Sequence, residues 1–492
     1  MGRGCSILFA FILSYSAAAQ SLVQITDDVD HRDFMPSDLL YFVDDSNKFT
    51  FEDISKEEFN SNFRKNSFYQ NSDFKKNSSY WIKLVLYLPT TSEKFWLLEF
   101  YDQTIDSLTA YVPQPNGGYK KVQLGDHQRF KSRLFIHKNF ELPITSVPHS
   151  TSVYYFKIRS HEFADMRVAL RSTSYFVYYA LNEYYLYGMF YGMILIISLY
   201  NFMVYLAIRE IKFIYYICYI ISVALYAMSY DGIGFQFLWP NQPWFNDWAV
   251  GISLYLVILW SLIFTKRFLS VRANAPMLNK VIKYVIIIRS AWFLISLIVF
   301  PKLLSYRVLE IIPLSIIFFT GITVWRQGYR PARFFVIAYG VLFSGFFLRT
   351  LVYLNFIPFT IVSHYSLHFS FVIEMLFLTV ALGDRIKILK DNRDRALKRI
   401  ISQQRSNIGL KDKVNRELEQ KVRERTREID LKNAQLEESN LKLTKQANEI
   451  TKLNSMLDLD NWKLKIKVKE VLEERMHEKQ MDYQEFLTLY PD

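Results

Sequence analysis

The chain is poor in cysteine, since Cys5 and Cys218 are the only two among 492 residues. Cys5 lies in an apolar run at the N-terminus that we expect to be removed, and Cys218 lies in a second apolar stretch. The mature chain would then have no cysteine pair with which to close a disulfide. Any domain that it places outside the cell must be stable through its hydrophobic core alone.

Signatures of catalysis and of metal binding are also absent from the sequence. His127, His137, His149 and His161 are scattered, with no cysteine partner and no spacing typical of metal ligands. There is no Gly-rich ATP lid, no histidine-kinase phosphoacceptor segment and no Gly-Gly-Asp-Glu-Phe cyclase signature. We therefore expect no catalytic residue, no metal site and no cofactor in this chain.

Charge is nearly absent from long runs between residues 184 and 383, although charged residues make up 22% of the whole. The formal net charge of +12 would suggest a nucleic-acid partner in a soluble protein. Here the positive residues lie mostly in loops and in a tail beside apolar stretches. This segregation indicates a membrane protein, with no nucleic-acid binding evident.

The first 19 residues have the order of a secretory signal peptide. Arg3 precedes an apolar run from Cys5 to Tyr15, and three alanines, 17–19, follow it. We expect cleavage before Gln20. The alternative is an uncut transmembrane helix, which the run is too short to form comfortably.

Seven later stretches of about 20 apolar residues are long enough to cross a bilayer as helices. Lys and Arg gather in the loops on one side of these spans and after the last one, whereas the other side offers only Lys302 and Arg307. The positive-inside rule places the tail in the cytoplasm, and the signal peptide places residue 20 outside. The spans are 184–207, 213–230, 248–265, 283–300, 308–325, 333–354 and 362–383.

Short patterns lie in a fixed order along these spans: Tyr191-Gly192, Tyr200-Asn201, Tyr215-Tyr216, Asp231-Gly232-Ile233-Gly234 leading to Trp239-Pro240, and Ala381-Leu382-Gly383-Asp384-Arg385-Ile386. Together they resemble the bacterial seven-transmembrane receptors with diverse intracellular signalling modules. The resemblance implies a multi-pass receptor of the bacterial inner membrane. It also implies an extracellular β-sandwich similar to carbohydrate-binding modules.

Residues 20–180 read as short strands separated by turn signals, with no helical periodicity. An antiparallel sandwich of the jelly-roll type is the natural architecture. Aromatic side chains in this domain could form a stacking platform for a sugar ring, or the two tryptophans could be core residues. The candidates for ligand binding are Trp81, Trp96, Tyr101, Tyr111 and Tyr119.

Ionisable residues inside the spans are costly and therefore candidates for function. Glu374 could pair with Arg289 or Arg349, either to separate two packing states or only to neutralise a buried charge. His364 and His368 are one helical turn apart, which would suit a metal site or a pH sensor, or bonds to a neighbouring helix.

Beyond residue 384 the composition predicts a long helix with a seven-residue apolar repeat. The repeat predicts a coiled coil, and asparagines at the a positions favour a parallel homodimer with a fixed register. A solvated single helix is the alternative. The d positions are Val422, Ile429, Leu436, Leu443, Ile450, Leu457, Leu464 and Val471, and the a-position asparagines are Asn433, Asn440, Asn454 and Asn461.

These patterns predict a signal peptide (1–19), an extracytoplasmic β-sandwich sensing domain (20–180), a seven-helix bundle (181–383), a signalling helix with a coiled coil (384–480) and the start of an absent output module (481–492). We expect a receptor that senses an extracytoplasmic small molecule, for example a carbohydrate, with an unknown cytoplasmic partner. The alternative is a sensor histidine kinase or cyclase whose catalytic domain is missing from this chain. A transporter is disfavoured because no repeat of broken half helices is visible.

Overall fold

The computed structural model describes residues 22–440, apart from 71–72, 90, 145–147, 162, 300–303, 305–309, 355 and 358–360, together with 453–467 and 470. The expected signal peptide and the segment 481–492 lie outside the described residues. Residues 1–384 form one compact unit and residues 385–492 form a second.

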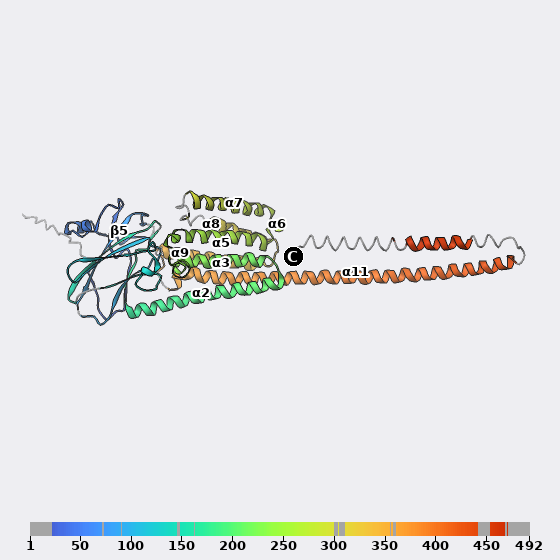
Figure 1. The fold of residues 1–492 in the computed structure, drawn as a ribbon, viewed down its shortest axis with the longest axis horizontal. Coiled ribbons are helices and arrows are strands. Elements are labelled where there is room, and N and C mark those ends of the chain that lie inside the picture. Colours follow the sequence, from blue (N-terminus) through green and yellow to red (C-terminus); the bar gives the residue numbers. More distant parts are fainter. Residues whose placement is uncertain are drawn as a thin grey trace, which may run out of the picture. The chain divides into compact units, whose positions relative to one another are not determined.

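The N-terminal domain is built from two β-sheets (Figure 1), as the turn spacing predicts. All strand pairs are antiparallel except β1 with β5. The larger sheet has the order β4 (Arg64–Lys65), β3 (Leu40–Asp44), β5 (Ser79–Leu88), β10 (Ser150–Arg159), β7 (Ser107–Pro113) and β8 (Tyr119–Leu124), with β1 (Leu22–Gln24) beside β5. The smaller sheet has the order β2 (His31–Phe34), β11 (Val168–Ser172), β6 (Trp96–Phe100) and β9 (Phe140–Pro143).

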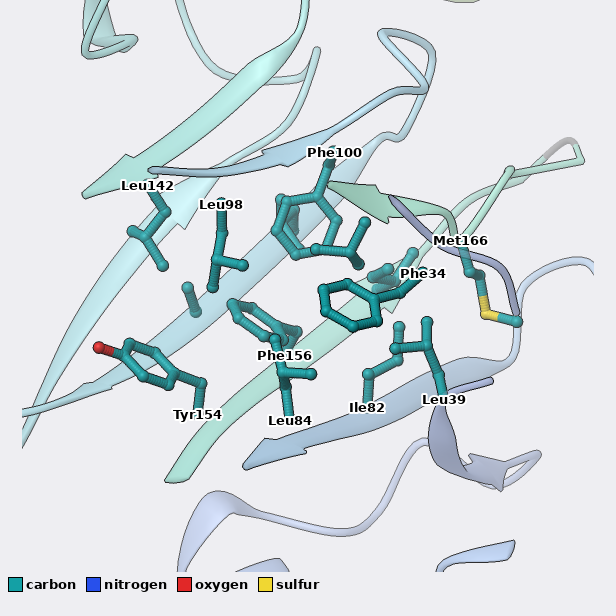
Figure 2. Close-up of a cluster of buried hydrophobic side chains, with 14 of the residues drawn as sticks. Phe34, Leu39, Ile82, Leu84, Leu98, Phe100, Leu142, Tyr154, Phe156 and Met166 are labelled. Carbon is teal, nitrogen blue, oxygen red and sulfur yellow. The ribbon is translucent and has the colours of Figure 1, made fainter. Parts of the chain in front are cut away.

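The space between the two sheets is filled by apolar side chains that alternate along the strands (Figure 2). Ile82 and Leu84 on β5 face Leu98 on β6 across this space, and Phe156 on β10 lies between them. Full burial of one such side chain contributes about 1.5–3 kcal/mol. The domain therefore has the core that a chain without disulfides requires.

Strand β5 is also buried on its outer face. Trp81 points away from the inter-sheet core and packs with Phe63 and Tyr155 beneath two short helices. Those helices are α1 (Phe51–Ile54) and η1 (Glu57–Asn62). A strand covered on both sides is apolar along most of its length, which hides its alternation in the sequence.

The helices that follow coincide with the seven expected spans. Six of those in the described ranges are long and apolar enough to cross a membrane, and α8 is apolar but only 16 residues long. The helices are α2 (Thr173–Ile208), α3 (Lys212–Tyr230), α5 (Asn246–Phe268), α7 (Pro276–Ile298), α8 (Ile311–Arg326), α9 (Ala332–Tyr353) and α11 (Ser366–Asn440). Short helices α4 (Ile233–Phe237), η4 (Pro243–Phe245), α6 (Val271–Asn274) and α10 (Ile361–His364) lie between them.

The sandwich passes into the first spanning helix without a linker. Strand β11 ends at Ser172 and α2 begins at Thr173, earlier than the boundary at residue 180 that the sequence suggests. The side chain of Ser172 accepts a hydrogen bond from the backbone N–H of Tyr175 and so caps the helix. With 36 residues, α2 is about 54 Å long and exceeds the ~30 Å hydrocarbon core, so part of it extends outside.

The second unit is helical where it is described, in the continuation of α11 and over residues 453–467. Val422, Leu457 and Leu464 have exposed side chains in the single chain, and Ile429 is partly buried. Asn454 and Asn461 are exposed as well. Coiled-coil pairing through these residues stays a prediction. Leu443 and Ile450 lie outside the described residues, and the side chains of Asn433, Leu436 and Asn440 are not described.

Candidate signalling junction between sandwich and helices

The connection from β8 to β9, residues 125–139, reaches from the sandwich to the helices, and we call it the junction loop. Its backbone N–H at Phe130 donates to the carbonyl of Pro240 at 3.1 Å. The Phe130 ring meets Phe235 of α4 edge to face, and both pack in one cluster with Trp239. The junction loop therefore docks on the turn that follows α3.

Two glycines of that turn allow the close approach. A Cβ at Gly232, where φ is +77°, would lie 2.8 Å from Cγ of Gln103 in the sandwich. A Cβ at Gly234 would lie 2.3 Å from the ring of Trp239. Gln103 also donates from Nε2 to the carbonyl of Tyr230 at 2.5 Å. Gly232 thus serves contact between the sandwich and the helices, whereas Gly234 makes room for Trp239 within the turn itself.

One carboxylate on α2, that of Glu183, lies at the centre of the junction and is almost fully buried. Lys138 Nζ lies 3.2 Å from it and His137 Nε2 lies 3.5 Å from it, both from the junction loop. The hydroxyl of Tyr365 donates to it at 2.6 Å from the residue before α11. Glu183 therefore joins the sandwich, the first spanning helix and the approach to the last one.

A second layer of buried charge lies behind this contact. His137 Nδ1 lies 2.6 Å from the Glu141 carboxylate, and Glu99 forms an ion pair with Arg171 at 2.9 Å. Burial alone would lower the pKa of His137, but its bonds to Glu141 and Glu183 and the nearby Glu99 outweigh burial and raise it to about 9. Burial raises the pKa of Glu141.

The atoms of Glu99, His137 and Glu141 lie close enough together to hold a metal ion. The three acids Glu99, Glu141 and Glu183 are, however, matched by Arg171, Lys138 and a protonated His137. Buried charges that are already paired gain little from a further cation. This cluster is best understood as an internal salt-bridge network.

A second cluster contains Asp106, His127, His161 and Asp247, whose ligand atoms also lie within metal-binding distance of one another. His127 Nε2 lies 2.9 Å from Asp247, and His161 Nδ1 lies 2.9 Å from Asp106. The hydrogen bond with Asp247 is the main reason that the pKa of His127 rises to about 9. No ligand spacing is visible in the sequence here, because the fold alone brings these residues together.

The residues predicted inside the spans do not pair as expected. Arg289 forms an ion pair with Glu310, at the start of α8, rather than with Glu374. Glu374 instead accepts a hydrogen bond from the hydroxyl of Tyr219 at 2.9 Å. The predicted contacts of Glu374 with Arg289 and with Arg349 are therefore wrong, because depth along the membrane does not say which face of a helix a side chain occupies.

Arg349 donates to the carbonyl of His364 at 3.0 Å and approaches the hydroxyl of Tyr230 at 3.4 Å. His368 lies 2.7 Å from the Asp231 carboxylate on the neighbouring turn. His364 and His368 thus bond to different partners, which favours the alternative of bonds to neighbouring helices. Unlike a helical i, i+4 pair, they lie on two separate helices, α10 and α11.

The five aromatic residues proposed for ligand binding do not form one platform. Trp81 and Trp96 are buried in two different clusters, as the core alternative predicts. Tyr101 lies beneath the guanidinium of Arg171, near α2. Tyr111 stacks on Phe51, and Tyr119, which is 39% exposed, lies edge to face with that same ring. Only Tyr111 and Tyr119 share one partly open surface.

Two models of known protein families match most of the chain. Residues 37–172 match the model described as 7TMR-DISM extracellular 2, and residues 183–385 match the one described as 7TM diverse intracellular signalling. A search of the curated proteins found no match. The two matched ranges together exceed half of the chain and coincide with the sandwich and the helices. The chain therefore belongs to the 7TM diverse intracellular signalling family, and it is a seven-transmembrane receptor with an extracellular β-rich domain.

Proposed function

We propose that this receptor detects a small molecule at its extracellular sandwich and passes the signal through the junction to a dimeric cytoplasmic coiled coil. The observation that carries the proposal is the contact set of Glu183, which links Lys138 of the sandwich to Tyr365 at the approach to α11. Helix α11 continues beyond the last span without a break. A displacement of its outer end could therefore be transmitted along one helix.

The ligand would act by favouring one of two arrangements of this junction. A ligand can shift such an equilibrium only by the difference between its affinities for the two states. Buried ion pairs are suited to distinguish two arrangements of the junction. When one partner moves away, the other charge stays unpaired in the low-dielectric interior, at a cost of several kcal/mol. A carbohydrate is a reasonable ligand class for the surface at Tyr111 and Tyr119, where rings offer flat apolar area beside hydroxyl groups.

The output would depend on pairing of two chains. Val422, Leu457 and Leu464 expose apolar side chains at heptad spacing, and a second copy would bury them. Asparagines at a positions favour a parallel pair in one register. We expect the tail and its partner in the cytoplasm of a bacterial cell, with the helices in the inner membrane.

Cysteine crosslinking in membranes tests the proposal. Val422→Cys, in a Cys218→Ser background, should form a disulfide-linked dimer, whereas Glu424→Cys at an outward position should crosslink far less. A glycan and metabolite panel should contain a compound that changes the crosslinking rate at Val422. That response should disappear in Glu183→Gln and persist in Glu93→Gln, which changes an exposed acid.

The outcomes separate the parts of the proposal. Equal crosslinking at both cysteine positions would refute the parallel coiled coil. A crosslinked dimer that responds to no compound would refute small-molecule sensing. A ligand response that survives Glu183→Gln unchanged would leave sensing intact and refute the role of the junction.

A further inference from the structure

Four potential metal ligands meet where the sandwich touches the first turn of α5. Asp106 precedes β7, His127 belongs to the junction loop and His161 follows β10. Asp247 is the second residue of α5. Their side chains are between 11% and 44% exposed, so the group is held by the fold and yet reachable from solvent.

The spacing of the ligand atoms suits a small cation. All four lie within 4.8 Å of one another, with 2.9 Å from His127 to Asp247 and 2.9 Å from His161 to Asp106. Ligands at about 2.0–2.2 Å from a tetrahedral zinc ion lie roughly 3.3 Å apart. The four atoms need only small side-chain movements to reach that geometry.

Asp126 supplies a second, independent observation. Its Oδ1 atom is buried and has no hydrogen-bond partner in the described part of the chain, and it lies 3.9 Å from His127 Nε2. Asp126 also lines a cavity of about 40 Å³ together with His161 and Asp247. A buried carboxylate oxygen left without a partner is costly, and a cation beside it would remove that cost.

The side chains around the cavity include more carboxylates than positively charged partners, which favours binding of a cation. Asp106, Asp126 and Asp247 form ion pairs only with histidines among the residues that the structure describes. The network of Glu99, His137 and Glu141 differs, because Arg171 and Lys138 already neutralise it. The group at α5 therefore carries an excess of carboxylates that the network of Glu99, His137 and Glu141 lacks.

We propose that Asp106, His127, His161 and Asp247 bind a divalent transition metal of the zinc class, with the buried carboxyl group of Asp126 beside the site. Two imidazoles with two carboxylates suit zinc, whereas calcium and magnesium prefer oxygen ligands alone. Binding replaces the protons that the imidazoles share with the carboxylates, and these protons leave to solvent. Because three ligands come from the sandwich and one from α5, the metal would clamp the sandwich to the bundle.

Metal binding to the full chain in detergent or nanodiscs tests the proposal. Zn²⁺ should bind at one high-affinity equivalent in calorimetry and raise the unfolding temperature, since it binds only the folded state. Co²⁺ should give the visible absorption of a four-coordinate site. The double variant His127→Gln with His161→Gln should weaken binding by more than the roughly 10- to 100-fold typical of losing an outer-shell partner.

A matched control is His149→Asn, which changes an exposed histidine away from the cluster and should leave the metal affinity unchanged. Asp247→Asn should weaken binding while the sandwich ligands stay intact, which tests the contribution of α5. A wild-type chain that binds no Zn²⁺, a double variant that binds it as tightly as wild type, or equal affinity for Ca²⁺ would each overturn the proposal.

Discussion

Leu98 and Phe156 bury hydrocarbon between the two sheets, whereas Glu183 and His137 bury charge where the sandwich meets the helices. Both regions exclude water, but their contacts respond differently to displacement. Apolar contacts are non-directional and lose stability in proportion to the area exposed. A buried ion pair depends on direction and becomes unfavourable when one partner moves away. The first region is suited to hold a fold and the second to distinguish two states.

The largest effect is expected in the sheet core. Phe156→Ala should reduce the free energy of unfolding of the sandwich by about 4 kcal/mol, because it removes a large buried ring and leaves a cavity. Hydrogen exchange of the full chain would measure the loss strand by strand. Phe68→Ala removes a ring that is 90% exposed and should change stability little. Equal losses in the two variants would contradict the assigned core.

A somewhat smaller loss is expected at the junction. Glu183→Leu should cost about 3 kcal/mol, because Lys138 is left buried without its counter-charge. Removing both charges, in Glu183→Leu with Lys138→Met, should recover a large part of that loss. The unfolding free energies of the two variants and wild type would show the coupling. If the double variant is less stable than Glu183→Leu alone, the contact is not the ion pair described here.

The smallest effect is a pH dependence at His137. Its pKa lies near 9 in the folded chain, above the ordinary value of about 6.5, so its stabilising contribution is complete below pH 6.5 and is lost as the pH rises through about 9. The slope for one proton is up to about 1.4 kcal/mol per pH unit. His137→Gln should flatten the decline of stability between pH 7 and pH 9.

In the metal-free chain the pKa of His127 also lies near 9, so part of the decline should remain in His137→Gln and disappear when His127→Gln is added. His149→Asn provides the comparison for loss of an ordinary histidine. Melting temperatures of the full chain across this pH range would measure each slope. A wild-type curve that is flat from pH 7 to pH 9 would contradict the raised pKa values.

The strands and the spanning helices could be predicted because their signals are local. The turn signals between the strands and the length of each apolar run are visible in a short window. Trp81 is ambiguous in the sequence, because β5 is covered on both faces and the residues of its outer face resemble a binding surface. The sequence predicts too late a start for α2, because the apolar run begins only after Glu183, while the helix begins at Thr173.

The pairs that form the sites could not be predicted, because they depend on register and on helix rotation. His161 reaches Asp106 because β10 and β7 pair with Arg159 opposite Ser107. Asp247 is 141 residues from Asp106 and joins them only through the docking of the sandwich on α5. Glu310 does not stand out in the sequence, because it lies at the edge of a span, although it is the partner of Arg289.

The direct passage from β11 to α2 also fixes the rotation of α2 about its own axis relative to the sandwich. Ser172 is held on one side by its backbone N–H, which donates to the carbonyl of Asp30 at 2.8 Å, and on the other by its cap on Tyr175. A helix turns about 100° for each residue, so one residue added or removed at this joint would carry Glu183 to a different side of the helix axis. No linker residue lies between β11 and α2 that could take up a rotation of one against the other. The sheet and α2 are therefore coupled in rotation. If the sandwich rotates about the axis of α2, the helix that enters the membrane rotates with it.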